Sequence, residues 1–264
     1  MFSKIFYINL DHRADRNNNT VDQLKKLDLL NKTERISGIY GLNLDINKIS
    51  PTLITKQGKD DALNPGQKVY TYLTKGAIGC ALSHRKAYEK IINDNIDAAL
   101  ILEDDITIDS LFNKKLQTLR ENIPEDYDIL FIGYHNTSLK HFNPQINEYY
   151  LKPKKLYGLF GYIVTNEGAR KLLDIFPITY QIDTEIPKHF DKINAYAVTP
   201  NKRLIYSDQS QKATKFGTDI QLRYTEPFSY KNNEILLSVL LIVIFVIVLI
   251  ILVLWLTKLI KKIE

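Results

Sequence analysis

The sequence predicts an α/β fold, a mainly parallel sheet flanked by helices, followed by one C-terminal transmembrane helix. Short apolar runs at 98–102 and 129–132 have the length and composition of strands that are buried on both faces. The segment 75–93 between two such regions is helical in pattern, because its core-type residues fall on one face at steps of four and three. Strands that alternate with helices are typical of crossover connections in a parallel sheet.

The other elements follow from local patterns. A strand is expected at 4–9, and Val21, Leu24 and Leu27 give helical spacing to 20–30. Residues 42–74 have weak periodicity and several prolines and glycines, so we expect a long, mobile connection there, a candidate substrate lid. The remaining predicted elements are a strand at 36–40, a strand at 98–103, a helix near 110–121, a strand at 128–133, a strand at 156–165, a helix at 166–176, a helix at 183–193 and a strand at 195–199.

Bulk composition is that of an ordinary globular protein. The chain has 264 residues, of which 45% are hydrophobic and 25% charged, with a net charge of +5. Its lysines and arginines form no dense cluster, so no nucleic-acid partner is expected. Cys80 is the one cysteine, which excludes an internal disulfide and fits a reducing compartment. We assign residues 1–230 to one catalytic domain.

The last thirty residues have a different composition. In the 22 residues of 235–256 only Ser238 and the indole of Trp255 are polar, and as a helix this segment is about 33 Å long, enough to cross a bilayer. A short basic tail, 257–264, follows. The chain starts without a signal peptide, which favours a cytosolic domain, although the positive-inside rule would keep the basic tail in the cytosol instead. We therefore predict a single-pass membrane protein with a cytosolic catalytic domain.

Three consecutive carboxylates, Glu103, Asp104 and Asp105, end the apolar run at 98–102. Ligands of open α/β sheets gather at the carboxyl ends of such strands. Clustered carboxylates repel one another unless a cation or strong donors compensate, and Mg²⁺ and Mn²⁺ prefer oxygen ligands of this kind. One interpretation is a metal site for a phosphate-bearing substrate, and the other is an acidic turn that caps the next element.

A second polar group follows the first strand. Asn9 and Asp11 can bind a base or ribose, and the forked guanidinium groups of Arg13 and Arg16, three residues apart, suit phosphate oxygens. The alternative is a solvated, charged start of a helix.

Two further groups carry polar side chains of interest. Ser83 and His84 follow small residues on the helix at 75–93, where they could reach a diphosphate or sugar or could be satisfied core residues. Cys80 is expected to be a small buried thiol rather than a nucleophile. Asp183 and Glu185 either cap a helix or supply a general base for an acceptor hydroxyl.

Together these segments resemble glycosyltransferase family 25, which contains bacterial lipopolysaccharide glycosyltransferases and collagen galactosyltransferases. The resemblance covers about residues 4–220. It rests on the motifs Phe6-Tyr7-Ile8-Asn9-Leu10-Asp11 with Arg13 and Arg16, Glu34-Arg35-Ile36 before Gly41, Gly76-Ala77-Ile78-Gly79-Cys80-Ala81-Leu82-Ser83-His84, Ile101-Leu102-Glu103-Asp104-Asp105, and Asp128-Ile129-Leu130-Phe131-Ile132-Gly133.

The resemblance implies a GT-A, Rossmann-like fold and an inverting transfer of a hexose, such as galactose or glucose. The donor would be a nucleotide sugar, with UDP expected, and the acceptor a glycan, a lipid-linked sugar or a protein hydroxyl. Mn²⁺ or Mg²⁺ would be bound by Glu103 and Asp105, with His189 or Asp208 as a third ligand. Asp183 would be the base, with Glu185 second. Donor contacts would come from Asn9, Asp11, Arg13, Arg16, Ser83, His84 and Asp104.

Two competing functions use the same residues. A metal-dependent nucleotidyltransferase or sugar-nucleotide hydrolase would also need the acidic strand end and the basic turn. The first strand lacks the glycine-rich loop expected for nucleotidyl transfer, which argues against that reading. The other competitor is a non-catalytic membrane scaffold that keeps a transferase-like fold.

Overall fold

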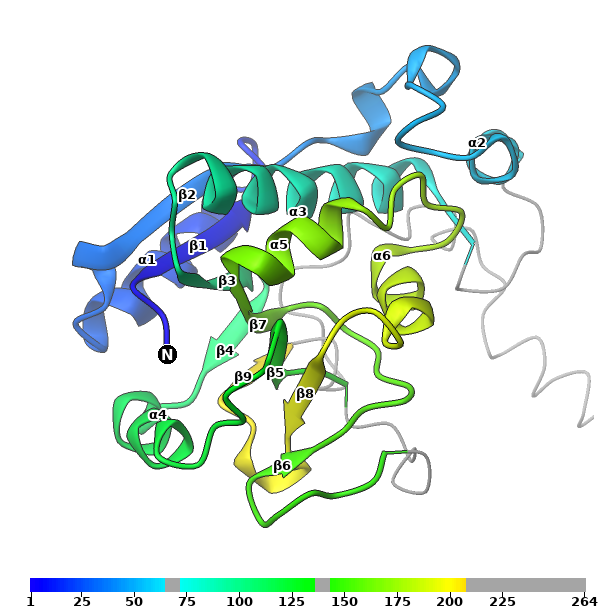
Figure 1. Cartoon of the computed structure of the whole chain (residues 1–264). Coiled ribbons are helices and arrows are strands. Elements are labelled where there is room, and N and C mark those ends of the chain that lie inside the picture. The colour runs from blue at the N-terminus through cyan, green and yellow to red at the C-terminus, as the bar shows by residue number, and fades with distance from the viewer. Residues whose placement is uncertain (65–71, 136–142, 208–264) are drawn as a thin grey trace, which may run out of the picture. The chain divides into compact units, whose positions relative to one another are not determined.

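Seven strands form one mixed sheet in the order β2-β1-β3-β7-β5-β8-β6 (Figure 1). A computed structural model describes residues 1–64, 72–135 and 143–207, which all belong to one compact unit, Met1–Leu222. The strands of the sheet are β1 (Lys4–Asn9), β2 (Thr33–Ser37), β3 (Ala98–Glu103), β5 (Ile129–Gly133), β6 (Tyr150–Leu151), β7 (Gly161–Thr165) and β8 (Ala195–Val198). A two-stranded sheet pairs β4 (Ile106–Ile108) with β9 (Ile205–Ser207).

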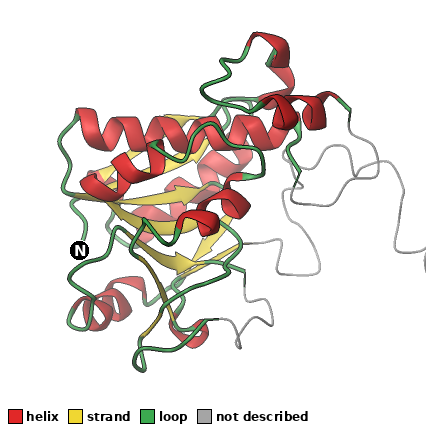
Figure 2. Cartoon of the chain, turned by 45° about the vertical axis from the view of Figure 1, so that its right-hand side comes forward, coloured by secondary structure: helices red, strands yellow, loops and turns green. Residues whose placement is uncertain are grey.

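Helices lie on either side of the strands (Figure 2). They are α1 (Ala14–Lys26), α2 (Lys56–Leu63), α3 (Lys75–Asn93), α4 (Phe112–Arg120), α5 (Asn166–Leu173) and α6 (Ile182–Glu185). α3 and α5 run side by side over one part of the sheet (Figure 1). Each starts at a threonine: Thr74 Oγ1 accepts from the Ala77 N–H at 2.9 Å, and Thr165 Oγ1 accepts from the Gly168 N–H at 2.9 Å.

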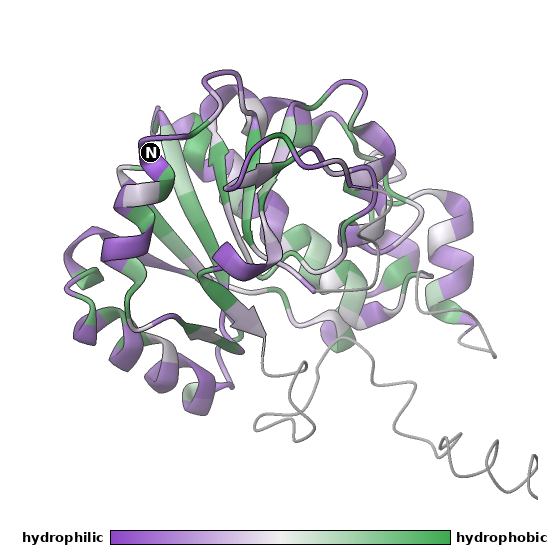
Figure 3. Ribbon diagram, turned by 90° about the horizontal axis from the view of Figure 1, so that it is seen from below, coloured by the Kyte–Doolittle hydropathy of each residue, from purple (hydrophilic) through white to green (hydrophobic). Residues whose placement is uncertain are grey.

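The core follows from the apolar strands. Leu100, Ile101 and Leu102 of β3 are at most 1% exposed, as expected for a central strand with helices over it. Colouring by hydropathy gives hydrophobic strands and helices that alternate between polar and apolar residues (Figure 3). β1 lies parallel to both β2 and β3, with Ile8 opposite Glu103, so the carboxyl ends of the three strands meet at one edge.

The predicted α/β class is confirmed, but the sheet is mixed rather than mainly parallel. Its parallel pairs are β1–β2, β1–β3 and β5–β8, while β7 runs antiparallel to both β3 and β5, and β6 antiparallel to β8. The predicted connection at 42–74 contains helix α2 and short 3-10 turns, and its residues 65–71 lie outside the described part. The helix expected at 183–193 is only one α-turn, α6, followed by the 3-10 segment Ile186–His189, which carries Pro187.

The membrane prediction needs correction. Over the residues that the structure describes, no helix has the length and apolar character needed to cross a bilayer. The longest, α3, has 19 residues and carries charged residues on the face turned away from the core. The predicted span 235–256 and tail 257–264 lie outside the described residues. The predicted localisation, single-pass with a cytosolic domain, is therefore wrong for the structure as described.

Candidate functional site

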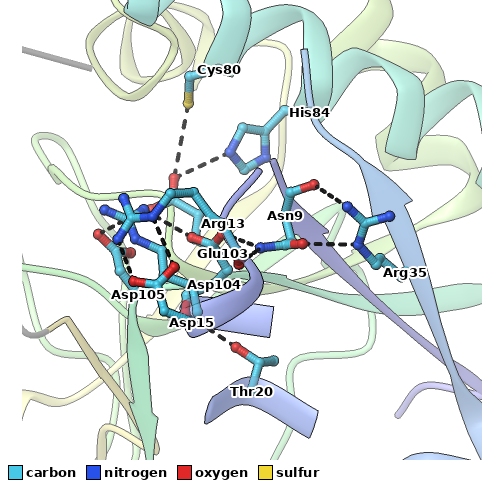
Figure 4. Close-up of polar contacts among 11 residues, drawn as sticks. Asn9, Arg13, Asp15, Thr20, Arg35, Cys80, His84, Glu103, Asp104 and Asp105 are labelled. Carbon is cyan, nitrogen blue, oxygen red and sulfur yellow. Dashed lines mark hydrogen bonds and ion pairs between the residues drawn. The ribbon is translucent and has the colours of Figure 1, made fainter. Parts of the chain in front are cut away.

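Many of the predicted site residues gather where the carboxyl ends of β1 and β3 meet α1 and α3 (Figure 4). A cavity of about 70 Å³ opens there. Its polar lining comprises Arg16 of α1, Cys80, Ser83 and His84 of α3, and Glu103, Asp104 and Asp105 at the end of β3. This is the strand-end position at which α/β sheets bind ligands.

Asp104 is the anchored member of the acidic triplet. Its side chain accepts from Asn9 Nδ2 at 2.7 Å and from Arg16 Nη1 at 3.0 Å, and Thr20 Oγ1 donates to its backbone carbonyl at 3.1 Å. Asp104 and Arg16 are both buried. Burial raises the pKa of Asp104, and the positive charge of Arg16 opposes that rise. Asp104 therefore ties β3 to β1 and α1, since a buried carboxylate is stable only with such donors.

Arg35 is a site residue that sequence reasoning did not select. From β2 its Nε donates to Asn9 Oδ1 at 2.9 Å, and its Nη2 donates to the Asn9 carbonyl at 3.1 Å and to Asp11 Oδ1 at 2.6 Å. The hydrogen bond from Arg35 holds the pKa of the exposed Asp11 below its usual range. The sequence offered one signal, because Arg35 lies in the motif Glu34-Arg35-Ile36 before Gly41. The structure adds that Arg35 pairs with Tyr7, on the face of the sheet that Asn9 shares.

The two arginines of the basic turn have different environments. Arg16 is buried, and its Nη1 lies 3.8 Å from Asp105 Oδ2 in addition to its bond with Asp104. Arg13 precedes the first residue of α1 and pairs with Asp15 at 2.8 Å. The structure therefore brings Arg16 into the cavity lining, whereas Arg13 and Asp11 are outside that lining.

Glu103 and Asp105 flank the anchored carboxylate, and both line the cavity. Burial raises the pKa of Asp105 to about 7, and the negative charge of Glu103 adds to this effect. A bound cation relieves the mutual repulsion of carboxylates that lie close together in a buried site. Their oxygens are the donors that Mg²⁺ and Mn²⁺ take, so these residues fit a hard divalent ion.

Helix α3 contributes residues with fixed partners. Ser83 Oγ donates to the Gly79 carbonyl at 2.6 Å and accepts from the Ile39 N–H at 2.8 Å, so its hydroxyl links α3 to the segment after β2. His84 is 1% exposed, and its Nδ1 and Nε2 lie 2.8 Å from Tyr162 Oη and 3.3 Å from Glu103 Oε1. Burial raises the pKa of the Cys80 thiol well above its usual range, so this cysteine is no activated nucleophile.

A close backbone contact explains the small residues of α3. A Cβ placed on Gly79 would lie 2.7 Å from the backbone nitrogen of Gly41 and closer still to the carbonyl oxygen of Ile39. Gly79 thus permits the close packing of α3 against the segment that follows β2.

Asp183 and Glu185 have separate roles in the structure. The Gly158 N–H donates to Asp183 Oδ2 at 3.1 Å from a backbone with φ of 87°, a conformation that favours glycine. Burial raises the pKa of Asp183, the Gly158 N–H lowers it, and the nearby charge of Glu103 raises it further. Glu185 is buried and accepts from the N–H groups of Thr179 and Tyr180 at 3.0 and 2.9 Å, so it holds the loop before α6.

The two suggested third metal ligands remain without support. His189 ends the 3-10 segment Ile186–His189 and is not part of the cavity lining. Asp208 lies outside the described residues.

A larger cavity of about 650 Å³ lies beyond the carboxyl end of β5. His135, Lys155, Asn201 and Lys202 are among its polar lining residues. Burial lowers the pKa of His135, and the charges of Glu103 and Asp183 oppose that decrease. Since the charges of both carboxylates act on the pKa of His135, a lining residue of this cavity lies within electrostatic range of the acidic site.

The family follows from the sequence comparison. The model of "Glycosyltransferase family 25 (LPS biosynthesis protein)" matches residues 2–186. This chain belongs to glycosyltransferase family 25. The matched range contains the acidic triplet, the basic turn, the α3 motif and both carboxylates of α6, so the whole candidate site lies inside it.

Some similar proteins are named for an enzyme activity, and others are named as inactive. Procollagen galactosyltransferase 1-B of Xenopus laevis is 28% identical over 202 residues, with 72% of this chain and 31% of the relative covered. Inactive glycosyltransferase 25 family member 3 of Homo sapiens is 28% identical over 211 residues, with 72% and 32% covered. The chain spans about a third of the length of these relatives.

One similar solved structure is "a glycosyltransferase involved in the glycosylation of the major capsid of PBCV-1". It is 10% identical with a TM-score of 0.41, and the alignment covers 77% of this chain and 91% of that one. A likeness this distant carries no argument about function.

Proposed function

We propose that this family 25 member is a sugar transferase that moves a hexose from a nucleotide-diphosphate donor to a hydroxyl acceptor. A UDP-sugar is the best candidate for the donor. The acceptor hydroxyl belongs to a glycan, a lipid-linked sugar or a protein. The observation that carries the proposal is the group of three consecutive carboxylates at the end of β3. All three line the cavity, and Asp104 is also anchored by Asn9 and Arg16. A GT-A arrangement of the domain is part of the proposal.

Glu103 and Asp105 are the residues proposed to hold a divalent ion, Mn²⁺ or Mg²⁺. When bound, such an ion would neutralise charge on the leaving nucleoside diphosphate. Asp104 has a supporting role, because its bonds to β1 and α1 fix the strand end that carries the two flanking carboxylates. The fixed frame means that the site needs little reorganisation when the donor binds.

The donor's nucleotide is proposed to contact the rim formed by Asp11 and Arg13. Asp11 is held by Arg35 and by Ser37 Oγ at 2.9 Å, with its side chain still 72% exposed, so its oxygens remain accessible to ribose hydroxyls. Arg13 carries a forked guanidinium that can leave the exposed Asp15 for a phosphate. Ser83 and His84 line the cavity but have protein partners, so we assign them to shaping the donor pocket.

Asp183 is the proposed general base. Its burial raises the pKa of the carboxyl, which makes it a stronger proton acceptor than an exposed aspartate. The acceptor hydroxyl would give its proton to Asp183 as its oxygen attacks the anomeric carbon from the face opposite the leaving diphosphate. Glu185, although close in sequence, is committed to the Thr179 and Tyr180 N–H groups.

The 650 Å³ cavity beside His135 is the proposed acceptor site. Its size suits a sugar or a peptide segment. Amide and ammonium groups from Asn143, Gln145, Asn201 and Lys202 supply the donors and acceptors that hydroxyl-rich ligands need.

The test compares Asp183→Asn with Glu185→Gln. Asp183→Asn should lower turnover by about 10²–10⁴-fold while donor affinity, measured by calorimetry with Mn²⁺, stays within about twofold. Glu185→Gln keeps an oxygen for the two N–H groups and should retain most turnover. Undiminished turnover in Asp183→Asn would remove this residue from the mechanism.

A non-catalytic role is the second candidate, because a relative of equal identity carries "inactive" in its name. That role predicts donor binding without turnover for every nucleotide sugar and acceptor. Turnover by the wild-type chain that depends on Asp183 would exclude it.

A further inference from the structure

Cys80, His84 and Glu103 bring three different donor atoms to one point of the small cavity. The thiol sulfur, an imidazole nitrogen and a carboxylate oxygen all lie within 4.8 Å of one another. The three side chains come from successive turns of α3 and from the end of β3, and all three line the 70 Å³ cavity. Figure 4 shows Cys80 and His84 both directed at the Glu103 carboxylate.

The hydrogen bonds of His84 determine which of its nitrogens faces Glu103 without a proton. Tyr162 Oη donates to Tyr88 Oη at 3.0 Å, so the oxygen of Tyr162 is left to accept from His84 Nδ1 at 2.8 Å. In the neutral imidazole the proton is then on Nδ1, and Nε2 turns its lone pair toward Glu103 Oε1. Metal-binding histidines are oriented in this way, with the second N–H donated to a fixed partner.

The distances agree with a shared ion better than with a direct ion pair. His84 Nε2 and Glu103 Oε1 are 3.3 Å apart, longer than the roughly 2.7–2.9 Å of a charge-assisted N–H···O bond. Around a tetrahedral Zn²⁺ the nitrogen and oxygen ligands are about 3.4 Å apart, and sulfur and oxygen about 3.6 Å. Cys80 Sγ lies 4.0 Å from Glu103 Oε1, so a small side-chain rotation would complete the set.

We propose that Cys80, His84 and Glu103 form a binding site for a borderline transition-metal ion, Zn²⁺ above all, that is distinct from the hard-ion role of Glu103 and Asp105. A thiolate and an imidazole select Zn²⁺ over Mg²⁺. The thiol proton passes to solvent as the sulfur binds. A Zn²⁺ ion held by these three side chains would take a water molecule as its fourth ligand.

The site has a consequence for catalysis that rests on the proposed function. Glu103 belongs to both ligand sets, so Zn²⁺ at Cys80 and His84 would draw it away from the nucleotide-sugar site. Zn²⁺ is then an inhibitor that competes with Mn²⁺.

Cobalt spectroscopy on the full metal-free chain tests the binding site without reference to sugar transfer. Because Cys80 is the one cysteine of the sequence, any thiolate-to-cobalt charge-transfer band must come from it. We expect one equivalent of Co²⁺ to produce this band and one equivalent of Zn²⁺ to abolish it. Absence of the band in the folded wild-type chain would overturn the proposal, whatever the result of a transferase assay.

Two variants separate a built site from a lone reactive thiol. Cys80→Ser should eliminate the band and weaken Zn²⁺ binding at least tenfold. Tyr162→Phe removes the oxygen that orients His84 and should weaken Co²⁺ binding by about 10–100-fold. Tyr150→Phe is the matched control, since Tyr150 is also fully buried and its hydroxyl donates to the Leu119 carbonyl. Equal Co²⁺ affinity in Tyr162→Phe and Tyr150→Phe would contradict the proposed ligand geometry.

Discussion

Replacing Asp105 with asparagine should stabilise the metal-free protein at neutral and alkaline pH. Asp105 is 7% exposed, and burial together with the charge of Glu103 raises its pKa from 3.8 to about 7. In the folded chain this carboxyl is therefore costly to ionise, while in the unfolded chain it ionises freely. Asparagine keeps the size of the side chain and removes the charge.

The sign and size of this change in the free energy of unfolding follow from the linkage between proton binding and folding. The folded chain holds the Asp105 proton more tightly than the unfolded chain, so the free energy of unfolding decreases as the pH rises from 3.8 toward 7 and levels off above it. A difference of about three pH units, at 1.36 kcal/mol each, sets an upper limit of about 4 kcal/mol. We expect Asp105→Asn to recover an amount of that order at pH 8 and little at pH 4.

Urea unfolding in EDTA at pH 4 and pH 8 measures the effect. Asp22→Asn is the control, because Asp22 is an exposed carboxylate on α1, and its substitution should change stability by less than about 0.5 kcal/mol at either pH. If Asp105→Asn and Asp22→Asn shift the unfolding midpoint equally at pH 8, the electrostatic account of the acidic triplet is refuted.

Two further predictions concern the frame of the site. Gly79→Ala should destabilise the fold by about 1–3 kcal/mol in urea unfolding, although alanine normally favours a helix, because its Cβ would meet the Gly41 backbone; a stabilised variant would disprove that close contact. Asn9→Ala removes a donor from the buried Asp104 and should cost about 1.5–3 kcal/mol at pH 7 by the same assay, and no loss would mean that Arg16 alone satisfies this carboxylate.

Local patterns predicted the elements well where the chain itself contains the signal. The apolar run at β3 and the spacing along α3 depend on burial and helical periodicity, which are written in consecutive residues. The direction of a strand cannot be predicted from consecutive residues, because β7 has the same apolar character in either orientation. The pairing of β4 with β9 joins two three-residue strands about 100 positions apart, a contact that no local pattern reveals.

For the candidate site too, some features could be predicted from the sequence and others only seen in the structure. The acidic triplet was identified from its position after a buried strand, but its internal roles were not, since Asp104 is distinguished only by the donors that Asn9 and Arg16 bring from elsewhere. The sequence predicts the same phosphate-binding role for Arg13 and Arg16, yet α1 starts at Ala14 and leaves Arg13 outside the helix.

The two carboxylates of α6 point away from each other because of helix geometry. Residues two apart on a helix point in nearly opposite directions, at about 100° per residue. Asp183 therefore reaches the Gly158 N–H near the acidic site while Glu185 turns to the Thr179 loop. The sequence predicts the same two alternative roles for both acidic residues, and the structure gives each of them different partners.

The nucleotide that the protein releases distinguishes glycosyl transfer from the competing chemistries. The full chain is incubated with a panel of nucleotide sugars and Mn²⁺, and the released nucleotide is identified by chromatography. Glycosyl transfer at this site predicts a free nucleoside diphosphate, formed with Mn²⁺ but not in EDTA, and lost in Asp105→Asn. Release of pyrophosphate or a nucleoside monophosphate would instead indicate nucleotidyl transfer or donor hydrolysis at the phosphate, and would contradict glycosyl transfer at this site.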